Sequence, residues 1–338
     1  MKIKLYTSFI LAVAVGLFFA TGVLYTGSYV FNLVKSKSYA LYETASDLGG
    51  KDFYGIIEES VEVKDSVINN LNRDKGNYYL FDKSKSFPKI TSQSYLVVDL
   101  DSGELIKQKN RDVVYPIASL TKLMTALVSI ETIDQEKETR VSYNAVNTYG
   151  KQGSLYSGQK INIGDLLYPL LLESSNDAAE VISEAESAKF FMANMNGKAK
   201  SIGLVNTYFD DPSGLSQYNV SSAEELFKMI QYIYENEPNI FEISKLKNFD
   251  NQDYKWFSNS RFRNDSNYYG GKNGYTDEAL HTLISIFDLP LVELDTATNN
   301  NSAIDLNRRI AIILLKGDET EDDTRSIVLW LLNNVYYQ

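Results

Sequence analysis

The chain has 338 residues, 44% of them hydrophobic and 23% charged, which is enough for one large domain or two ordinary ones with a substantial core. Its formal net charge of −11 argues against nucleic-acid binding, because phosphate backbones are recognised by clustered Lys and Arg. The chain has no Cys and one His, so a zinc site built from Cys or paired His is excluded, and with it a zinc peptidase of the H-E-x-x-H type. We expect no metal and no cofactor.

The first 34 residues are unlike the rest of the chain. Residues 5–34 carry no charge and are flanked by lysines on both sides. About 20 apolar residues span a bilayer, whereas a cleavable signal peptide has an apolar stretch of only about 7–15. We therefore expect residues 1–34 to be a membrane anchor with the remaining chain outside the cytoplasm; a cleaved, secreted protein and a buried soluble helix are the alternatives. Residues 35–90 are polar without sustained periodicity, which predicts a juxtamembrane spacer.

Residues 91–338 show the patterning of a folded domain. Residues 94–100 and 104–106 predict two strands joined by a turn, and residues 120–130 are apolar nearly all round, as in a helix buried within a domain. Further helices are predicted over 165–172, 178–186, 222–235 and 325–336, the third opened by a capping box at Ser222 and Glu225. Strands are predicted over 281–287 and 309–315. Strands at both ends with helices between them predict an α/β (α+β) fold whose sheet is built from the two chain ends.

Ser119 and Lys122 stand three residues apart at the start of the apolar stretch 120–130. On a helix, positions i and i+3 lie on one face about 5–6 Å apart, so Lys122 is expected to reach the Ser119 hydroxyl. A serine needs a base to become a nucleophile, and a lysine can serve when burial and the positive end of a helix dipole lower its pKa. The same spacing recurs elsewhere, but here it follows an X-Pro turn and opens a buried helix. An ordinary helix cap is the alternative.

Two later segments carry further polar groups. Ser174 and Asn176 stand between two predicted helices, and they offer a hydroxyl for proton relay and an amide to hold a substrate carbonyl or orient the lysine. Residues 270–276 precede the strand predicted at His281; their glycines allow a backbone to approach a ligand closely, and Lys272 supplies positive charge. Taken alone, the first segment is typical of a loop and the second of a turn.

In this order the S-x-x-K at 119–122, the S-x-N at 174–176 and the K-x-G at 272–274 resemble the motifs of the penicillin-recognising serine hydrolases. The chain more closely resembles the D-alanyl-D-alanine carboxypeptidases of peptidase family S11. That resemblance covers residues 91–338 and rests on YPIASLTKLMTAL at 115–127, LESSNDAA at 172–179, MNGKAK at 195–200 and DPSGLS at 211–216, followed by SSA at 221–223.

The resemblance implies a β-lactamase-like fold, with an antiparallel sheet flanked by helices and a helical subdomain at about 140–240. It implies cleavage of the terminal D-alanine from peptidoglycan stem pentapeptides through an acyl-enzyme, with β-lactams as inhibitors. The implied catalytic residues are Ser119 as nucleophile, Lys122 as its base and Ser174 as proton relay to the leaving amine. The implied binding residues are Asn176 for the substrate, Lys272 for its terminal carboxylate, the backbone N–H groups of Ser119 and Tyr275 for the oxyanion, and the neighbouring Asn273, Gly274 and Thr276.

Asn273 stands where the family has Thr, so carboxylate recognition is expected to differ, with Thr276 as another source of a hydroxyl. Carboxypeptidase, endopeptidase and transpeptidase outcomes share one acyl-enzyme, and the sequence leaves them open. The other readings are a class A β-lactamase, a non-catalytic cell-wall-binding protein and a Ser-His-Asp hydrolase that uses His281.

Overall fold

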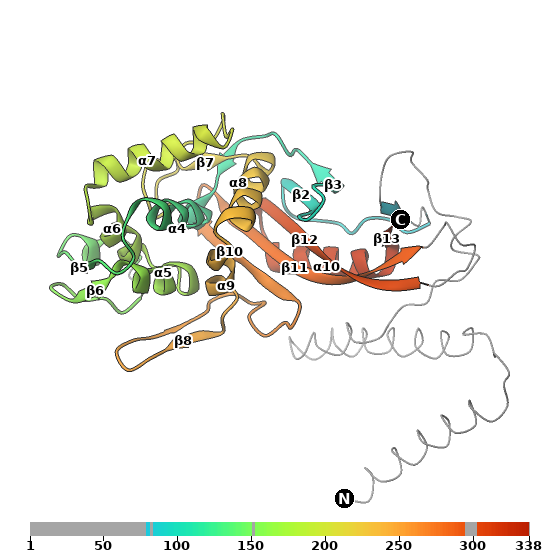
Figure 1. Cartoon of the computed structure of the whole chain (residues 1–338). Helices are drawn as coiled ribbons and strands as arrows, with labels where there is room; N and C mark the ends of the chain where they lie inside the picture. The colour runs from blue at the N-terminus through green and yellow to red at the C-terminus, as the bar shows by residue number, and fades with distance from the viewer. Residues whose placement is uncertain (1–78, 82–83, 151–152, 295–302, 338) are drawn as a thin grey trace, which may run out of the picture. The chain divides into compact units, whose positions relative to one another are not determined.

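A seven-stranded sheet forms the centre of the computed structural model, which describes residues 79–81, 84–150, 153–294 and 303–337 (Figure 1). Its strands are β1 (Tyr79–Phe81), β2 (Ser94–Asp99), β3 (Leu105–Lys109), β10 (Tyr268–Thr276), β11 (Leu280–Leu294), β12 (Ala303–Gly317) and β13 (Val335–Tyr337). The order is β1-β13-β11-β12-β2-β3, and β10 also pairs with β11. The sheet is therefore built from the two ends of the folded part of the chain, as predicted, with the helices inserted between them.

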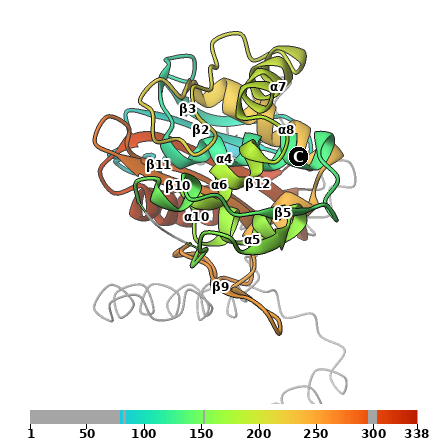
Figure 2. The ribbon, with the colours of Figure 1, turned by 90° about the vertical axis from the view of Figure 1, so that its left-hand side faces the viewer.

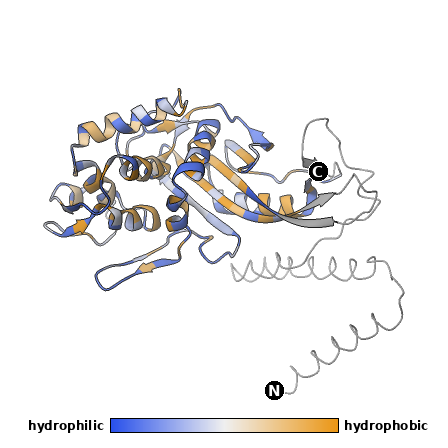
Figure 3. Ribbon diagram, viewed as in Figure 1, coloured by the Kyte–Doolittle hydropathy of each residue, from blue (hydrophilic) through white to orange (hydrophobic). Residues whose placement is uncertain are grey.

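The long strand β11 organises this sheet. Its first half pairs with β10, from Tyr268 opposite Phe287 to Thr276 opposite Leu280, and its far end pairs with β13. The strand pairs of this sheet are antiparallel except for β11–β13, which is parallel. This pair differs from the fully antiparallel sheet that was expected. Residues 310–315 of β12 are all apolar and fully buried, since helices cover both faces of the sheet (Figure 3).

The helices divide between the sheet and a separate helical layer. They are η2 (Ala118–Leu120), α4 (Thr121–Thr132), η3 (Ala145–Asn147), α5 (Ile163–Leu172), α6 (Asn176–Glu184), α7 (Ala188–Ser201), α8 (Ala223–Asn236), α9 (Asn239–Ser244) and α10 (Thr320–Asn334). Helices α8 and α10 pack against opposite faces of the sheet, and α4 to α7 gather beyond its β10 end (Figures 1 and 2). Three two-stranded pairs complete the described part: β4 (Tyr115–Pro116) with β7 (Val220–Ser221), β5 (Glu138–Arg140) with β6 (Lys160–Asn162), and β8 (Asn248–Asp250) with β9 (Lys255–Phe257).

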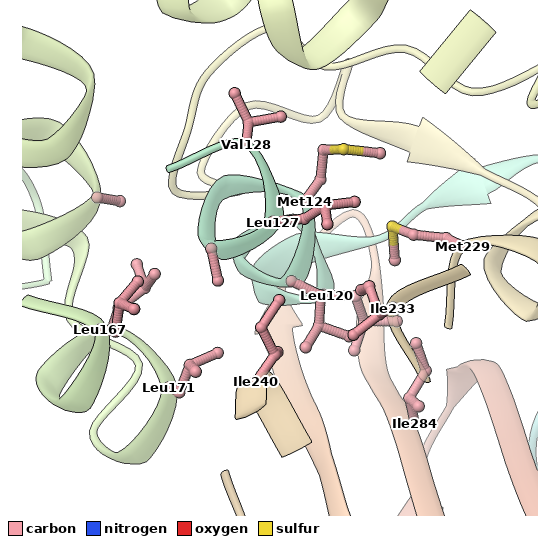
Figure 4. Close-up of a cluster of buried hydrophobic side chains, with 14 of the residues drawn as sticks. Leu120, Met124, Leu127, Val128, Leu167, Leu171, Met229, Ile233, Ile240 and Ile284 are labelled. Carbon is pink, nitrogen blue, oxygen red and sulfur yellow. The ribbon is translucent and has the colours of Figure 1, made fainter. Parts of the chain in front are cut away.

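The core fixes α4, the helix that carries Lys122. Every residue from Thr121 to Ser129 is buried. Its apolar side chains meet side chains of four other elements, shown in Figure 4. These are Leu167 and Leu171 of α5, Met229 and Ile233 of α8, Ile240 of α9 and Ile284 of β11. A close-packed interior holds α4 in one position, so the residues at its first turn are held equally firmly.

The helix α8 begins as predicted, with one difference. The Ser222 hydroxyl accepts a hydrogen bond from the Glu225 backbone N–H at 3.2 Å, which is the expected N-cap. The Glu225 carboxylate does not complete a reciprocal capping box. It accepts hydrogen bonds from the Val205 and Asn206 N–H groups and the Thr207 hydroxyl instead, and so fixes the loop before β7.

Three elements differ from expectation. Residues 270–276, typical of a turn, belong to the strand β10, which pairs along its length with β11. The closing helix ends at Asn334 because Val335 to Tyr337 pair with β1 as the strand β13. The sheet also begins before residue 91, because β1 lies within the segment expected to be a spacer.

The predicted membrane anchor lies outside the described residues, as does most of the predicted spacer. Within the described ranges, no helix has the length and apolar character needed to cross a bilayer.

Candidate active site

The turn that leads into α4 presents Ser119. Ala118, just before it, has a positive φ of 48°, an unusual conformation for a residue with a side chain. Gly214 lies against this turn; a Cβ on it would stand 2.0 Å from the Ala118 carbonyl oxygen, and its own φ is +87°. Gly274 of β10 approaches from the other side, where a Cβ would stand 2.7 Å from the Ser119 nitrogen. The turn is therefore held between two backbone segments that approach closely because they have glycine there.

Lys122 Nζ lies 2.9 Å from Ser119 Oγ, as the i, i+3 spacing predicts. It also donates to Asn176 Oδ1 at 2.7 Å and to the Ser213 carbonyl oxygen. The side chain is fully buried, and burial lowers the pKa of Lys122 to about 7, although the carboxylates of Asp211 and Glu180 act in the opposite direction. A lysine in this position loses its proton near neutral pH.

The loop 211–216 positions the Ser213 carbonyl. The Asp211 carboxylate accepts hydrogen bonds from the backbone N–H groups of residues 213–216 and from the Ser213 hydroxyl. Burial acts to raise the pKa of Asp211, but these hydrogen bonds outweigh it and leave the pKa below its ordinary value. Asp211 therefore stays ionised and keeps the loop closed, and Thr125 of α4 ties it further by donating to the Pro212 carbonyl at 2.6 Å.

The turn between α5 and α6 places the second motif beside Lys122. The Asn176 amide is held at both ends, since its Oδ1 accepts from Lys122 and its Nδ2 donates to the Tyr149 carbonyl at 2.8 Å. Ser174 stands two residues earlier with a positive φ of 59° and is partly exposed. Strained backbone of this kind clusters at functional sites. The Ser174 hydroxyl forms no hydrogen bond with another described residue.

The third motif forms the edge strand β10. The Lys272 side chain is buried and donates to the Asn273 carbonyl oxygen at 2.8 Å, with Asn273 Oδ1 at 3.4 Å. Burial, and then the positive charge of Lys122, lower the pKa of Lys272 well below its ordinary value. Within the described part of the chain Lys272 forms no ion pair, so the site offers a buried amine that lacks an anion.

The remaining residues of this motif have separate surroundings. Thr282 of β11 donates to the Ile117 and Gly274 carbonyls and so joins β10 to the turn that carries Ser119. Tyr275 is 55% exposed, and its ring lies 4.7 Å from that of His281. The Thr276 hydroxyl accepts from the Ala279 N–H, which makes it part of the β10–β11 turn. His281 thus packs against Tyr275 on the adjacent strand, and its side chain forms no hydrogen bond with Ser119 in the described part of the chain.

The structure therefore joins Ser119, Lys122 and Asn176 in one hydrogen-bonded group and brings Gly274 against it. Two contributors were not expected from the sequence: the Ser213 carbonyl, and the Tyr149 carbonyl that orients Asn176. The DPSGLS string at 211–216 could have indicated the Ser213 carbonyl. No sequence pattern indicated the Tyr149 carbonyl. Among the described residues no group of three or more His, Cys, Asp or Glu side chains is placed to bind a metal ion.

Comparisons with known proteins identify the family of the chain. The profile of the D-alanyl-D-alanine carboxypeptidase family, peptidase S11, matches residues 82–288. The D-alanyl-D-alanine endopeptidase of Escherichia coli is 33% identical over 216 residues, which are 59% of this chain and 68% of the relative. The endopeptidase of Haemophilus influenzae is 36% identical over 160 residues, 46% of this chain and 54% of the relative. The carboxypeptidase DacF of Bacillus subtilis is 29% identical over 205 residues, which are 57% of this chain and 53% of the relative. The chain thus spans about half the length of the latter two.

Solved structures share the fold. The D-alanyl-D-alanine carboxypeptidase of Mycobacterium tuberculosis superimposes with a TM-score of 0.63 at 24% identity, covering 74% of this chain and 94% of that one. Penicillin-binding protein D2 of Listeria monocytogenes, solved with cefotaxime bound, superimposes with a TM-score of 0.61 at 22% identity. The match covers 73% of this chain and 99% of that one. Because the family profile matches well over half of the chain, this protein belongs to the D-alanyl-D-alanine carboxypeptidase family, peptidase S11.

Proposed function

We propose that the chain is a serine D-Ala-D-Ala carboxypeptidase that works through an acyl-enzyme on Ser119. The observation that carries this proposal is the set of partners around Lys122. Asn176 Oδ1 and the Ser213 carbonyl oxygen can only accept hydrogen bonds, whereas the Ser119 hydroxyl can also donate one. A neutral amine has two N–H donors and one lone pair. Its donors go to the two obligate acceptors, and its lone pair faces the serine proton.

This arrangement supports a complete reaction. Ser119 Oγ attacks the carbonyl carbon of the penultimate D-alanine while its proton passes to Lys122 Nζ. The oxyanion is stabilised by the backbone N–H groups of Ser119 and Tyr275; the close approach of Gly274 to the Ser119 nitrogen supports this pairing. The proton passes through Ser174 to the leaving amine as the C–N bond breaks. A water molecule then attacks the ester, Lys122 takes its proton, and the acid product leaves with Ser119 restored.

The buried Lys272 holds the terminal carboxylate of the substrate. An anion beside this amine favours its charged form, so substrate binding raises the lowered pKa of Lys272. The Asn273 and Thr276 side chains line the same strand. The substrate is the stem pentapeptide of peptidoglycan, β-lactams acylate the same serine, and the catalytic domain works in the cell envelope outside the cytoplasm, with residues 1–34 as its anchor.

A D-alanyl-D-alanine endopeptidase is the second candidate. It is favoured by the Escherichia coli and Haemophilus influenzae relatives, which carry that name and are 33% and 36% identical over their matched regions. The chemistry at Ser119 is the same, and the leaving amine then belongs to a second stem peptide.

The test is the release of D-alanine from a peptide ending in D-Ala-D-Ala, compared between the full chain and its Ser119→Ala variant. We expect release by the first and none by the second. If neither protein releases D-alanine, or both do, the proposal is wrong; a folded chain that lacks the activity would favour the non-catalytic wall-binding alternative.

A further inference from the structure

Tyr149 presents its aromatic ring to solvent directly beside the second motif. The residue is 85% exposed. Its hydroxyl forms no hydrogen bond with a described residue, and its ring packs on no other aromatic ring in that part of the chain. A side chain that stays in water buries little apolar surface, so this ring contributes little to the stability of the fold.

The backbone that carries the ring is nevertheless held in place. The Tyr149 carbonyl oxygen accepts a hydrogen bond from Asn176 Nδ2 at 2.8 Å. A Cβ on Gly150 would stand 3.0 Å from the same nitrogen, so the two segments approach closely because residue 150 is glycine. Further along, Nε1 of the buried Trp256 donates to the Gly153 carbonyl at 2.8 Å. Tyr149 therefore combines an exposed ring with a backbone fixed to the site.

The Asn176 amide directs a substrate towards this ring. Its nitrogen carries two N–H groups; one donates to the Tyr149 carbonyl, and the other forms no hydrogen bond within the described residues. The two acceptors of one NH₂ group lie about 5 Å apart, because each stands about 2.9 Å from the nitrogen along a different N–H bond. A substrate carbonyl that accepts from the second N–H thus lies within reach of the Tyr149 side chain.

One part of the substrate can supply that carbonyl. In the proposed function, the scissile carbonyl oxygen lies at the backbone N–H groups of Ser119 and Tyr275, and Lys272 holds the terminal carboxylate. The carbonyl groups that remain belong to the residues before the penultimate D-alanine. The acyl part of the stem peptide, and not the residue that leaves, therefore passes Tyr149.

We propose that the Tyr149 ring is a specificity-determining contact for the acyl part of the substrate, the stem-peptide residues that precede the penultimate D-alanine. This inference rests on the proposed function and deepens it. An aromatic ring packs on the aliphatic carbons and flat amide groups of a peptide chain, while the phenol oxygen stays in water. The contact favours substrates with a long acyl part over truncated ones.

The test compares two substrates with the full-length protein. One is a pentapeptide that ends in D-Ala-D-Ala. The other is N-acetyl-D-Ala-D-Ala, which keeps the carbonyl for Asn176 but has a methyl group in place of the rest of the chain. The variants are Tyr149→Ala and Tyr149→Phe. The matched control is Tyr143→Ala, which removes a 72% exposed ring from the same segment between β5 and β6; the Tyr143 carbonyl accepts from Asn147 and not from the second motif.

We expect Tyr149→Ala to lower the ratio of kcat/KM for the pentapeptide to kcat/KM for the acetylated dipeptide about three- to tenfold, as for the loss of one aromatic contact. Tyr149→Phe and Tyr143→Ala should keep the wild-type ratio. The inference is wrong if Tyr149→Ala keeps that ratio, even where both activities fall together, or if either of the other variants lowers it equally. A folded wild-type protein that cleaves neither peptide and is not acylated by penicillin would show instead that the proposed function has failed.

Discussion

Replacing Lys122 with methionine removes the amine while keeping an unbranched side chain of similar length. Lys122→Arg is a poorer test of the base than Lys122→Met. Lys122 is completely buried, and a guanidinium group would overpack its site. The methionine variant tests two properties of Lys122 separately: its role as base, and its lowered pKa.

The lowered pKa makes a prediction about stability. Burial places the pKa of Lys122 at about 7 in the folded protein, against 10.5 as its ordinary value. Between these two values the unfolded chain binds more protons than the folded one, so the stability of the wild-type protein rises with pH across that window. The gain from this group approaches about 1.4 kcal/mol per pH unit. The methionine variant has no such gain.

The magnitude at pH 7 follows from the same numbers. Burying the amine there costs about 4 kcal/mol, which methionine recovers. Against this, Asn176 Oδ1 and the Ser213 carbonyl each lose a donor, at about 1–3 kcal/mol per buried acceptor. The two effects offset, and we expect the free energies of unfolding of variant and wild type to agree within about 2 kcal/mol at pH 7.

Urea denaturation at pH 7 and pH 9 measures this directly. Between the two pH values, we expect the free energy of unfolding of the wild type to rise by about 2–3 kcal/mol relative to that of the variant. A difference that is the same at both would show that Lys122 titrates as an ordinary lysine. The rate of acylation by penicillin tests the base itself and should fall about 10²–10⁴-fold in the variant. A folded variant that is acylated at the wild-type rate would refute the role of Lys122 as base.

Three further substitutions test other parts of the site. Asn273→Thr should speed acylation about tenfold, because a misplaced charge-assisted hydrogen bond costs roughly 1.5–3 kcal/mol. The gain in rate should vanish when the terminal carboxylate of the peptide is amidated. A slower variant would show that the site is adapted to the Asn273 side chain. Glu180→Gln removes a carboxylate that raises the pKa of Lys122, so the acid limb of the pH profile for acylation should move to lower pH, whereas a shift to higher pH would contradict the assigned electrostatics. Gly214→Ala should unfold the protein or abolish acylation, since its Cβ would overlap the Ala118 carbonyl oxygen; thermal denaturation with near-normal stability and activity would show that this turn is more adaptable than its packing implies.

Local patterns predicted the elements whose burial is periodic or continuous. The apolar stretch 120–130 became α4, and the i, i+3 spacing correctly predicted the approach of Lys122 to Ser119. The strand β10 was not predicted, because its glycines and polar residues are depleted in strands generally. It is a strand because β11 pairs with it and because Gly274 must pass close to the Ser119 nitrogen.

The partners of Lys122 come from distant parts of the chain. Asn176 is 54 residues away and Ser213 is 91, so only the packing of α6 and of the loop 211–216 against α4 brings them together. The helix α7 was missed as well, because few of its residues are buried: Phe191, Met195 and Ala199. The roles proposed for these residues came from resemblance to a family, because spacing alone assigns none.

Ser119 acts in this proposal as a nucleophile that Lys122 activates. A direct test is to incubate the full-length protein with a fluorescent penicillin, digest it and locate the labelled peptide by mass spectrometry. We expect a single covalent adduct on Ser119, formed faster as pH rises through about 7, where Lys122 loses its proton. An adduct on another serine, or no adduct with any β-lactam on the folded protein, would contradict it.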